Sequence, residues 1–285
     1  MSARLRTFGV VGAGTMGGGI AQKIALEGAP VTVLDTTEAA LEKGRARMEE
    51  LFAESVKRRL LSQGDVDVAR GRLTFSTDAG ALAACDLVVE AVFEDRTVKK
   101  NLFSTLEGIL RPDAVLATNT SSFQVGSFQA DLKHPERFVG LHFFFHPVKN
   151  RLLEVIPGAC TSRATLSLAR SFCTLLGKVD LPCPDTPGFI VNRFFVPWLN
   201  EAVRLASEGL APAGIETAAL DAFGVSLGPF ALMDATGVPI AYHAALGLAA
   251  DLGTFYSPDE RLVRQSTVGP WGPPGGDHTP LAAAT

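Results

Sequence analysis

The chain has 285 residues, of which 47% are hydrophobic and 20% are charged, so it has the composition of a globular protein with a large core. A formal net charge of −4 argues against a nucleic-acid-binding protein, and no apolar run approaches the length of a membrane span. The four cysteines lack metal-ligand spacing and no signal-peptide core precedes them, so we expect reduced thiols, no metal site and a cytoplasmic location.

Short apolar runs alternate with longer segments of helical spacing over the first 185 residues. The runs predict strands, and the segments between them predict amphipathic helices. This alternation is typical of an α/β protein, and we expect an N-terminal Rossmann-like domain with a doubly wound, mostly parallel sheet. The expected strands are residues 6–11, 31–35, 73–75, 86–92, 114–117, 138–142 and 152–156, and the expected helices are residues 15–27, 38–61, 95–110 and 163–177.

The alternation ends at a segment rich in Pro and Gly, after which the chain predicts helices only. We therefore expect a second, all-α C-terminal domain, with one domain over residues 1–185 and the helical one over 186–285. The last thirty residues are rich in Pro and Gly and predict a loosely ordered tail. The expected helices of the second domain are residues 189–208, 212–223 and 231–249.

The two domains differ in charge and in the roles that we expect of them. Residues 1–185 hold 22 Lys and Arg against 21 Asp and Glu, whereas residues 186–285 hold 4 against 9. An anionic ligand is therefore expected to bind mainly to the first domain. The apolar helical surface of residues 189–249 predicts a homodimer through the second domain, which is also expected to complete the substrate cleft.

A Gly-x-Gly-x-x-Gly turn joins the first expected strand to the first expected helix, and Asp35 ends the next strand. In a dinucleotide site such glycines permit the tight turn, the approach of the pyrophosphate and close helix packing, and the acid binds the adenosine ribose. Because Asp35 repels a 2′-phosphate, NAD is favoured over NADP; the alternative is an ordinary βαβ turn. The residues predicted to contact the dinucleotide are Gly12, Ala13, Gly14, Thr15, Met16, Gly17 and Asp35.

A histidine and an acid stand in neighbouring expected strands. His142 lies at the end of a strand, where ligands bind in such sheets, and is either a catalytic base or a packing residue. Glu154 lies inside an apolar run, where a carboxylate is costly unless paired. The economical interpretation pairs Glu154 with His142, and the alternative is a salt bridge to an arginine.

The chain resembles the 3-hydroxyacyl-CoA dehydrogenase family over at least residues 5–237. The segments that carry the resemblance follow one another at the family's spacing. They are the glycine turn, Asp86–Glu94, Asn119–Ser122, Gly140–Phe144, Leu152–Ile156, Asp185–Arg193 and Gly228–Phe230.

The resemblance implies NAD-dependent oxidation of an (S)-3-hydroxyacyl-CoA to a 3-oxoacyl-CoA in fatty-acid or short-chain acyl-CoA metabolism. It implies that His142 is the general base and that Glu154 orients it and stabilises the imidazolium. The other implied residues are Ser121 and Asn192, which bind the reacting substrate oxygens, and Glu94, Lys99 and Asn119, which lie near the nicotinamide and its ribose.

The CoA phosphates need cations, and the basic run at the end of the long helix offers Arg58 as a substrate-binding candidate. A charge run on a helix is otherwise a solvated face. The segment after His142 departs from the family's His-Phe-Phe-Asn-Pro: either Phe145 replaces the Asn, or a Phe is inserted and His146 takes its place. The family's Lys-Thr-Gly-x-Gly-Phe-Tyr ending is also absent, which bears on the dimer interface.

Two rival functions remain open from the sequence. One is a related NAD-dependent dehydrogenase acting on a hydroxy acid without CoA, such as an L-gulonate dehydrogenase. The other is a non-catalytic dinucleotide-binding or crystallin-like protein, against which the intact set of expected catalytic residues argues. That set is Ser121, His142, Glu154 and Asn192.

Overall fold

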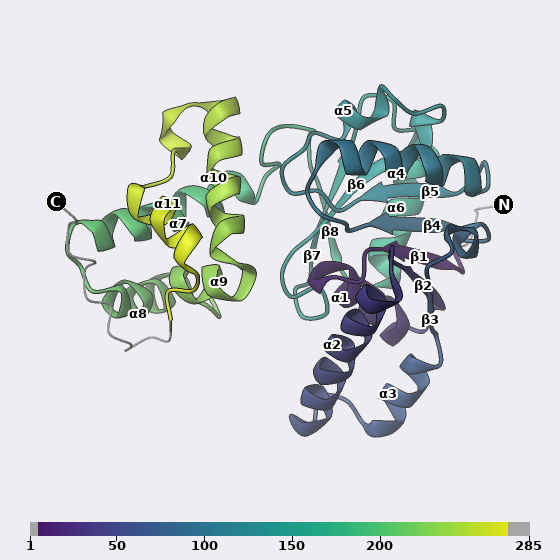
Figure 1. Cartoon of the computed structure of the whole chain (residues 1–285), viewed down its shortest axis with the longest axis horizontal. Helices are drawn as coiled ribbons and strands as arrows, with labels where there is room; N and C mark the ends of the chain where they lie inside the picture. The colour runs from purple at the N-terminus through teal and green to yellow at the C-terminus, as the bar shows by residue number, and fades with distance from the viewer. Residues whose placement is uncertain (1–4, 273–285) are drawn as a thin grey trace. The chain divides into compact units, whose positions relative to one another are not determined.

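An eight-stranded sheet organises the first part of the chain in the computed structural model, which describes residues 5–272 (Figure 1). The strand order is β3-β2-β1-β4-β5-β6-β7-β8, and every neighbouring pair is parallel except β6 with β7. The strands are β1 (Phe8–Val11), β2 (Val31–Leu34), β3 (Leu73–Ser76), β4 (Leu87–Glu90), β5 (Val115–Thr118), β6 (Phe138–Phe143), β7 (Leu152–Pro157) and β8 (Val179–Pro182).

Helices connect these strands and cover both faces of the sheet (Figure 1). Phe138 and Phe143 lie five residues apart on β6 and so face opposite sides. The Phe138 ring lies 4.9 Å from that of Phe103 on α4, and the Phe143 ring lies 6.5 Å from that of Phe172 on α6. The helices are α1 (Thr15–Leu26), α2 (Glu38–Lys57), α3 (Gln63–Arg70), α4 (Arg96–Ile109), α5 (Gly126–Gln129) and α6 (Arg163–Leu175), with 3-10 turns η1 (Ala79–Leu82) and η2 (Pro135–Arg137).

The chain divides into two compact units, residues 1–186 and 187–285. The second unit is helical, and its core packs Val203, Met233 and Leu262 together. Its described elements are α7 (Asn192–Ser207), α8 (Pro212–Phe223), α9 (Pro229–Thr236), α10 (Val238–Leu252), η3 (Thr254–Tyr256) and α11 (Glu260–Val268).

The predicted fold class is confirmed: a doubly wound, mostly parallel sheet with helices precedes an all-α region. None of the helices between residues 5 and 272 is both long and apolar enough to span a membrane.

Four local predictions were wrong. The helix expected over residues 231–249 is two helices, α9 and α10, because Gly237 between them has φ +107°. The helix expected over residues 38–61 ends at Lys57, and a new helix, α3, starts after Ser62, whose hydroxyl accepts the N–H of Asp65 while the Asp65 carboxylate accepts that of Ser62. Strand β8 was missed because its four residues include Asp and Pro and show no buried alternation.

The fourth wrong prediction is the loosely ordered tail. Within the last thirty residues, α11 buries Leu262, and the backbone N–H groups of Trp271 and Gly272 donate to the Asp234 carboxylate at 2.7 and 3.0 Å. The segment up to residue 272 is therefore tied to α9. Residues 273–285 of the expected tail lie outside the described residues.

Candidate active site

In the glycine turn between β1 and α1, side chains at Gly12 and Gly17 would collide with neighbouring backbone, whereas the space beside Gly14 is open. Gly12 has φ +102°, and a Cβ there would lie 2.6 Å from the carbonyl oxygen of Ala91. A Cβ on Gly17 would lie 1.9 Å from the Gly12 oxygen, whereas nothing lies within 4 Å of a Cβ placed on Gly14. Gly14 is the N-cap of α1 and supplies no side-chain cap, so the first N–H groups of the helix are left for an anion. The turn fits a dinucleotide pyrophosphate.

Asp35 follows β2 and reaches back to this turn. Its Oδ2 accepts the N–H of Ala13 at 2.7 Å, and its Oδ1 accepts the N–H of Thr36 at 2.7 Å. These contacts fix the carboxylate beside the turn. Oδ1 also accepts the Thr36 hydroxyl at 3.4 Å, so Oδ2 is the oxygen that keeps a lone pair for a further donor. The arrangement suits a carboxylate that accepts ribose hydroxyls.

His142 and Glu154 are directly opposite each other in the antiparallel β6–β7 pair. The His142 Nδ1 lies 2.7 Å from the Glu154 Oε2, and the two residues are 6% and 0% exposed. Because a carboxylate only accepts, Nδ1 carries the proton and donates it, which leaves Nε2 as the basic nitrogen. The pair lies where β6 ends, at the same edge of the sheet as the glycine turn that follows β1.

Asn119 secures the end of the strand that carries this histidine. It follows β5, and its side-chain Oδ1 accepts the N–H of Phe143 at 2.8 Å, one residue beyond His142. Its own N–H donates to the Glu90 carbonyl at 2.8 Å. Asn119 therefore links the ends of β4, β5 and β6.

A buried ion-pair cluster lies behind these strand ends. The Lys99 Nζ on α4 lies 2.7 Å from the Glu90 Oε1 and 2.9 Å from the Glu94 Oε2. Lys99 and Glu90 have side chains that are 1% and 0% exposed, whereas that of Glu94 is 31% exposed. Glu90 also accepts the Thr118 hydroxyl at 2.6 Å and the Val92 N–H at 2.8 Å. Its role was missed from the sequence, where it looks like the last residue of an apolar strand.

The second carboxylate of this cluster organises the Ser121 loop. The Glu94 Oε1 accepts the N–H groups of Ser121 and Ser122, both at 3.2 Å, and the Thr120 hydroxyl. The Ser121 and Ser122 hydroxyl oxygens lie 3.5 Å apart. Lys99 thus reaches this loop through Glu94, and its own ammonium lies beneath the surface.

The remaining candidates stand on other elements. Asn192 is the first residue of α7, in the second unit. Arg58 follows α2, and its Nε lies 2.5 Å from the Glu54 Oε1, with 61% of its side chain exposed. His146 lies in the β6–β7 connection, and its Nδ1 accepts the Val148 N–H at 3.4 Å. Burial, together with the charge of Lys149, lowers the pKa of His146.

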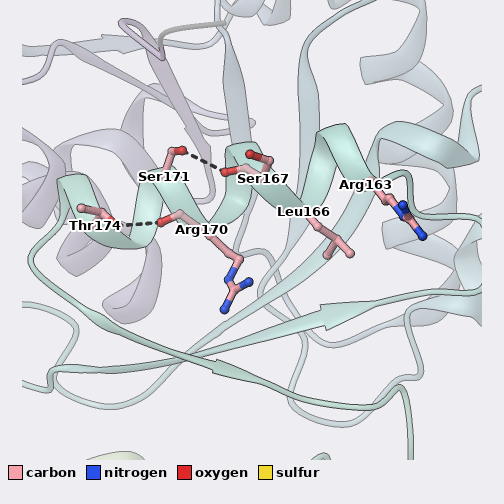
Figure 2. Close-up of a pocket in the computed structure, with 6 residues that line it drawn as sticks. All are labelled: Arg163, Leu166, Ser167, Arg170, Ser171 and Thr174. Atoms are coloured by element: carbon pink, nitrogen blue, oxygen red, sulfur yellow. Dashed lines mark hydrogen bonds between the residues drawn. The ribbon is translucent and has the colours of Figure 1, made fainter. Parts of the chain in front are cut away.

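Figure 2 shows a hollow along the outer side of α6, lined by Arg163, Leu166 and four residues further along the helix. The Ser171 and Thr174 hydroxyls donate to backbone carbonyls of the same helix at 2.9 and 3.1 Å. The Arg170 Nε donates to Asp180 at 2.7 Å. With these donors engaged, we assign no catalytic role to the hollow.

The fold and the turn define the class: a Rossmann-type dinucleotide-binding domain followed by a helical domain. Residues 7–186 match the 3-hydroxyacyl-CoA dehydrogenase NAD binding domain, and residues 188–269 match the 3-hydroxyacyl-CoA dehydrogenase C-terminal domain. The chain belongs to the 3-hydroxyacyl-CoA dehydrogenase family.

Individual relatives agree with this assignment. A probable 3-hydroxybutyryl-CoA dehydrogenase of Deinococcus radiodurans is 38% identical over 81% of this chain and 83% of its own length. A 3-hydroxybutyryl-CoA dehydrogenase of Mycobacterium tuberculosis is 36% identical over 97% of this chain and 98% of its own. The crystal structure of an (S)-3-hydroxybutyryl-CoA dehydrogenase from Ralstonia eutropha superposes with a TM-score of 0.84 at 32% identity, covering 93% of this chain and 94% of that one.

These findings confirm the family resemblance, the prediction of an NAD-dependent oxidoreductase and NAD as its cofactor.

Proposed function

We propose that this protein oxidises (S)-3-hydroxyacyl-CoA to 3-oxoacyl-CoA with NAD, using His142 as the general base. The observation that carries the proposal is the buried pair of His142 with Glu154, whose Nδ1 and Oε2 atoms lie 2.7 Å apart at the edge of the sheet that also holds the glycine turn. Oxidation of an alcohol requires a group that takes the hydroxyl proton as hydride leaves the carbon. An oriented imidazole with a basic Nε2 meets that need.

In the proposed mechanism the substrate O3–H proton passes to the Nε2 of His142, and a carbonyl forms at C3. NAD, when bound, accepts the hydride that leaves C3. The imidazolium formed on His142 keeps its Nδ1–H on the Glu154 carboxylate, whose charge offsets the new positive charge in buried surroundings. Glu154 also fixes the tautomer, because it accepts only.

Ser121 and Asn192 are proposed to hydrogen-bond the reacting oxygens of the substrate. Support for Ser121 comes from its loop, whose N–H groups are fixed by Glu94 so that the hydroxyl has a defined location. Support for Asn192 comes from the Asp185–Arg193 motif and from its place at the start of α7.

The cofactor contacts are proposed in the same way. The turn from Gly12 to Gly17 binds the pyrophosphate and Asp35 binds the adenosine ribose. Glu94 and Asn119 lie at strand ends on the edge where the nicotinamide half is expected. Lys99 is 1% exposed, so we propose that it acts on the cofactor site through Glu94.

Arg58 is proposed as a contact for a CoA phosphate. The Arg58 guanidinium lowers the pKa of Glu54 by hydrogen bonding to its carboxylate, so a phosphate has to compete with an existing partner. Arg58→Ala should raise the KM for the CoA thioester and leave the KM for NAD unchanged. The matched control is Arg45→Ala within α2, where the Arg45 side chain pairs with Glu38 and Glu42, and it should leave both KM values unchanged.

The relatives' names favour a short acyl chain, so we propose 3-hydroxybutyryl-CoA as the first substrate to test and short-chain or fatty acyl-CoA metabolism as the setting. The second unit exposes Phe194, Phe223 and Ile240, which supports the proposed homodimer. The four cysteines are free thiols, which supports the proposed cytoplasmic location.

The deciding experiment measures NADH formation with a panel of (S)-3-hydroxyacyl-CoA thioesters, their (R)-isomers, and free hydroxy acids including L-gulonate. Turnover of the (S)-thioesters alone is the expected result. Faster turnover of a free hydroxy acid than of any thioester would replace the CoA function by the related hydroxy-acid dehydrogenase. Binding of NAD without turnover of any substrate would indicate a non-catalytic dinucleotide-binding protein.

A further inference from the structure

The connection between β6 and β7, residues 144–151, joins the strand of His142 to that of Glu154 and is held by a lysine from another element. Lys178 lies between α6 and β8, and its Nζ donates to the carbonyl oxygens of Pro147 at 2.8 Å and Asn150 at 2.6 Å. Lys178 is 7% exposed. Two carbonyl groups of the connection therefore accept hydrogen bonds from one buried amine.

The surroundings of this amine disfavour its protonated form. Within residues 5–272, no carboxylate lies within ion-pair distance of Lys178, although the charge of Glu27 acts on it and favours the protonated amine. Burial lowers its pKa to about 8, and the charge of Lys23 acts in the same direction. A neutral amine still has two N–H groups, one for each carbonyl, so both contacts survive loss of the proton. A methionine would fill the same space without this penalty, so the polar head is explained by the two carbonyls it binds.

The other side of the connection packs against α1, the helix that follows the glycine turn. Pro147 is buried, and a Cβ placed on Gly19 of α1 would lie 3.0 to 3.3 Å from three atoms of its ring. The ring of Phe143, the residue after His142, lies 5.4 Å from the Lys178 Nζ. The connection is thus fixed between Lys178 and the helix that follows the glycine turn.

We propose that Lys178 is a positioning residue for the oxidation: by fixing residues 144–151 between itself and α1, it keeps the His142 imidazole aligned with Glu154 and with the dinucleotide turn. This inference rests on the function proposed above. Lys178 acts only through the backbone of the connection.

The test is a double-mutant cycle of Lys178→Met with His142→Ala. Since small displacements of a catalytic group cost up to about 100-fold, Lys178→Met should lower kcat by roughly 10- to 100-fold while the Kd for NAD changes less than about 3-fold. In the His142→Ala background Lys178→Met should cause no further loss, because the residue it positions is gone. Lys149→Met, which removes an exposed ammonium from the same connection, should leave kcat unchanged.

A kcat within about 2-fold of wild type for Lys178→Met, or an equal loss with and without His142, would overturn the inference in favour of a purely structural role. If Lys178→Met does not fold, Gly19→Ala presses on Pro147 from the other side and should give the same pattern. The downfield proton resonance of the His142 Nδ1–H, assigned by its loss in His142→Ala, provides a readout that needs no turnover. It should shift or broaden in Lys178→Met. If that resonance shifts while His142→Ala retains full turnover, the positioning role stands and the proposed base fails.

Discussion

Among the described residues, Lys99 is the one cation that pairs with both Glu90 and Glu94. Replacing Lys99 by methionine removes that charge. The Lys99 Nζ lies 2.7 Å from Glu90 and 2.9 Å from Glu94, and both Lys99 and Glu90 are almost entirely inaccessible to water. After the substitution Glu90 remains a buried carboxylate whose described partners are the Thr118 hydroxyl and the Val92 N–H. Glu94 reaches the surface, so its charge is hydrated more easily.

The expected cost follows from that difference in burial. Removing one partner of a buried ion pair destabilises a protein by about 3–5 kcal/mol. For a unit of 186 residues, at about 2–4 °C per kcal/mol, Tm should fall by roughly 6–20 °C. Lys100→Met is the matched control, because the neighbouring Lys100 side chain is 38% exposed and pairs with Asp131 at 2.6 Å on the surface. Such a pair contributes about 0–1 kcal/mol.

The assay is thermal and urea unfolding of both variants, which give Tm and the free energy of unfolding, followed by the double variant Lys99→Met with Glu90→Gln. Removing the orphaned charge should recover most of the lost stability, since a buried pair is often replaceable as a whole. If Lys99→Met is no more destabilising than Lys100→Met, or if the double variant is less stable than Lys99→Met alone, the ion-pair reasoning fails.

Three further predictions follow from other sites. Asp35→Ala should weaken NAD binding and reduce the preference for NAD over NADP, measured as the ratio of kcat/KM for the two cofactors. Equal use of NAD and NADP by the wild type would contradict the role of Asp35. Because the folded pKa of Lys178 is about 8 and the model-compound value is 10.5, the unfolded chain binds more protons between these pH values, so unfolding free energy should rise with pH there by up to about 3 kcal/mol. That rise should be missing in Lys178→Met, and a parallel pH dependence of the two proteins would refute it. Light scattering at micromolar concentration should give the mass of a homodimer, and a monomer would rule the proposed assembly out.

The features predictable from the sequence are those set by local pattern. Continuous apolar runs such as Leu87–Val89 gave the parallel strands, since a strand buried on both faces needs apolar residues at successive positions. The glycine turn was predictable because Gly12 and Gly17 have no sterically acceptable substitute. The facing of His142 and Glu154 was within reach because the pair stands in consecutive strands and both residues interrupt apolar runs.

The features missed depend on contacts between distant segments. Lys178 looks like a surface lysine after a helix, and only the fold shows that its amine reaches carbonyl groups 28 and 31 residues away. Glu90 and Lys99 stand nine positions apart across a strand–helix junction, and no sequence period marks such a pair. Helix α11 lies in a Pro- and Gly-rich region and is stabilised by burial of Leu262, not by propensity. The chain after it is held by the Trp271 N–H, which donates to Asp234 of α9.

The central claim, that His142 is the base and Glu154 its orienting partner, is tested most directly by turnover of His142→Ala, Glu154→Gln and the double variant with an (S)-3-hydroxyacyl-CoA. Each single substitution should lower kcat by about 100-fold or more, and the double variant should be little worse than His142→Ala, because the two residues act as one unit. NAD affinity should barely change. His146→Ala is the control for the neighbouring histidine and should retain turnover. Loss of turnover in His146→Ala with normal turnover in His142→Ala would contradict the account.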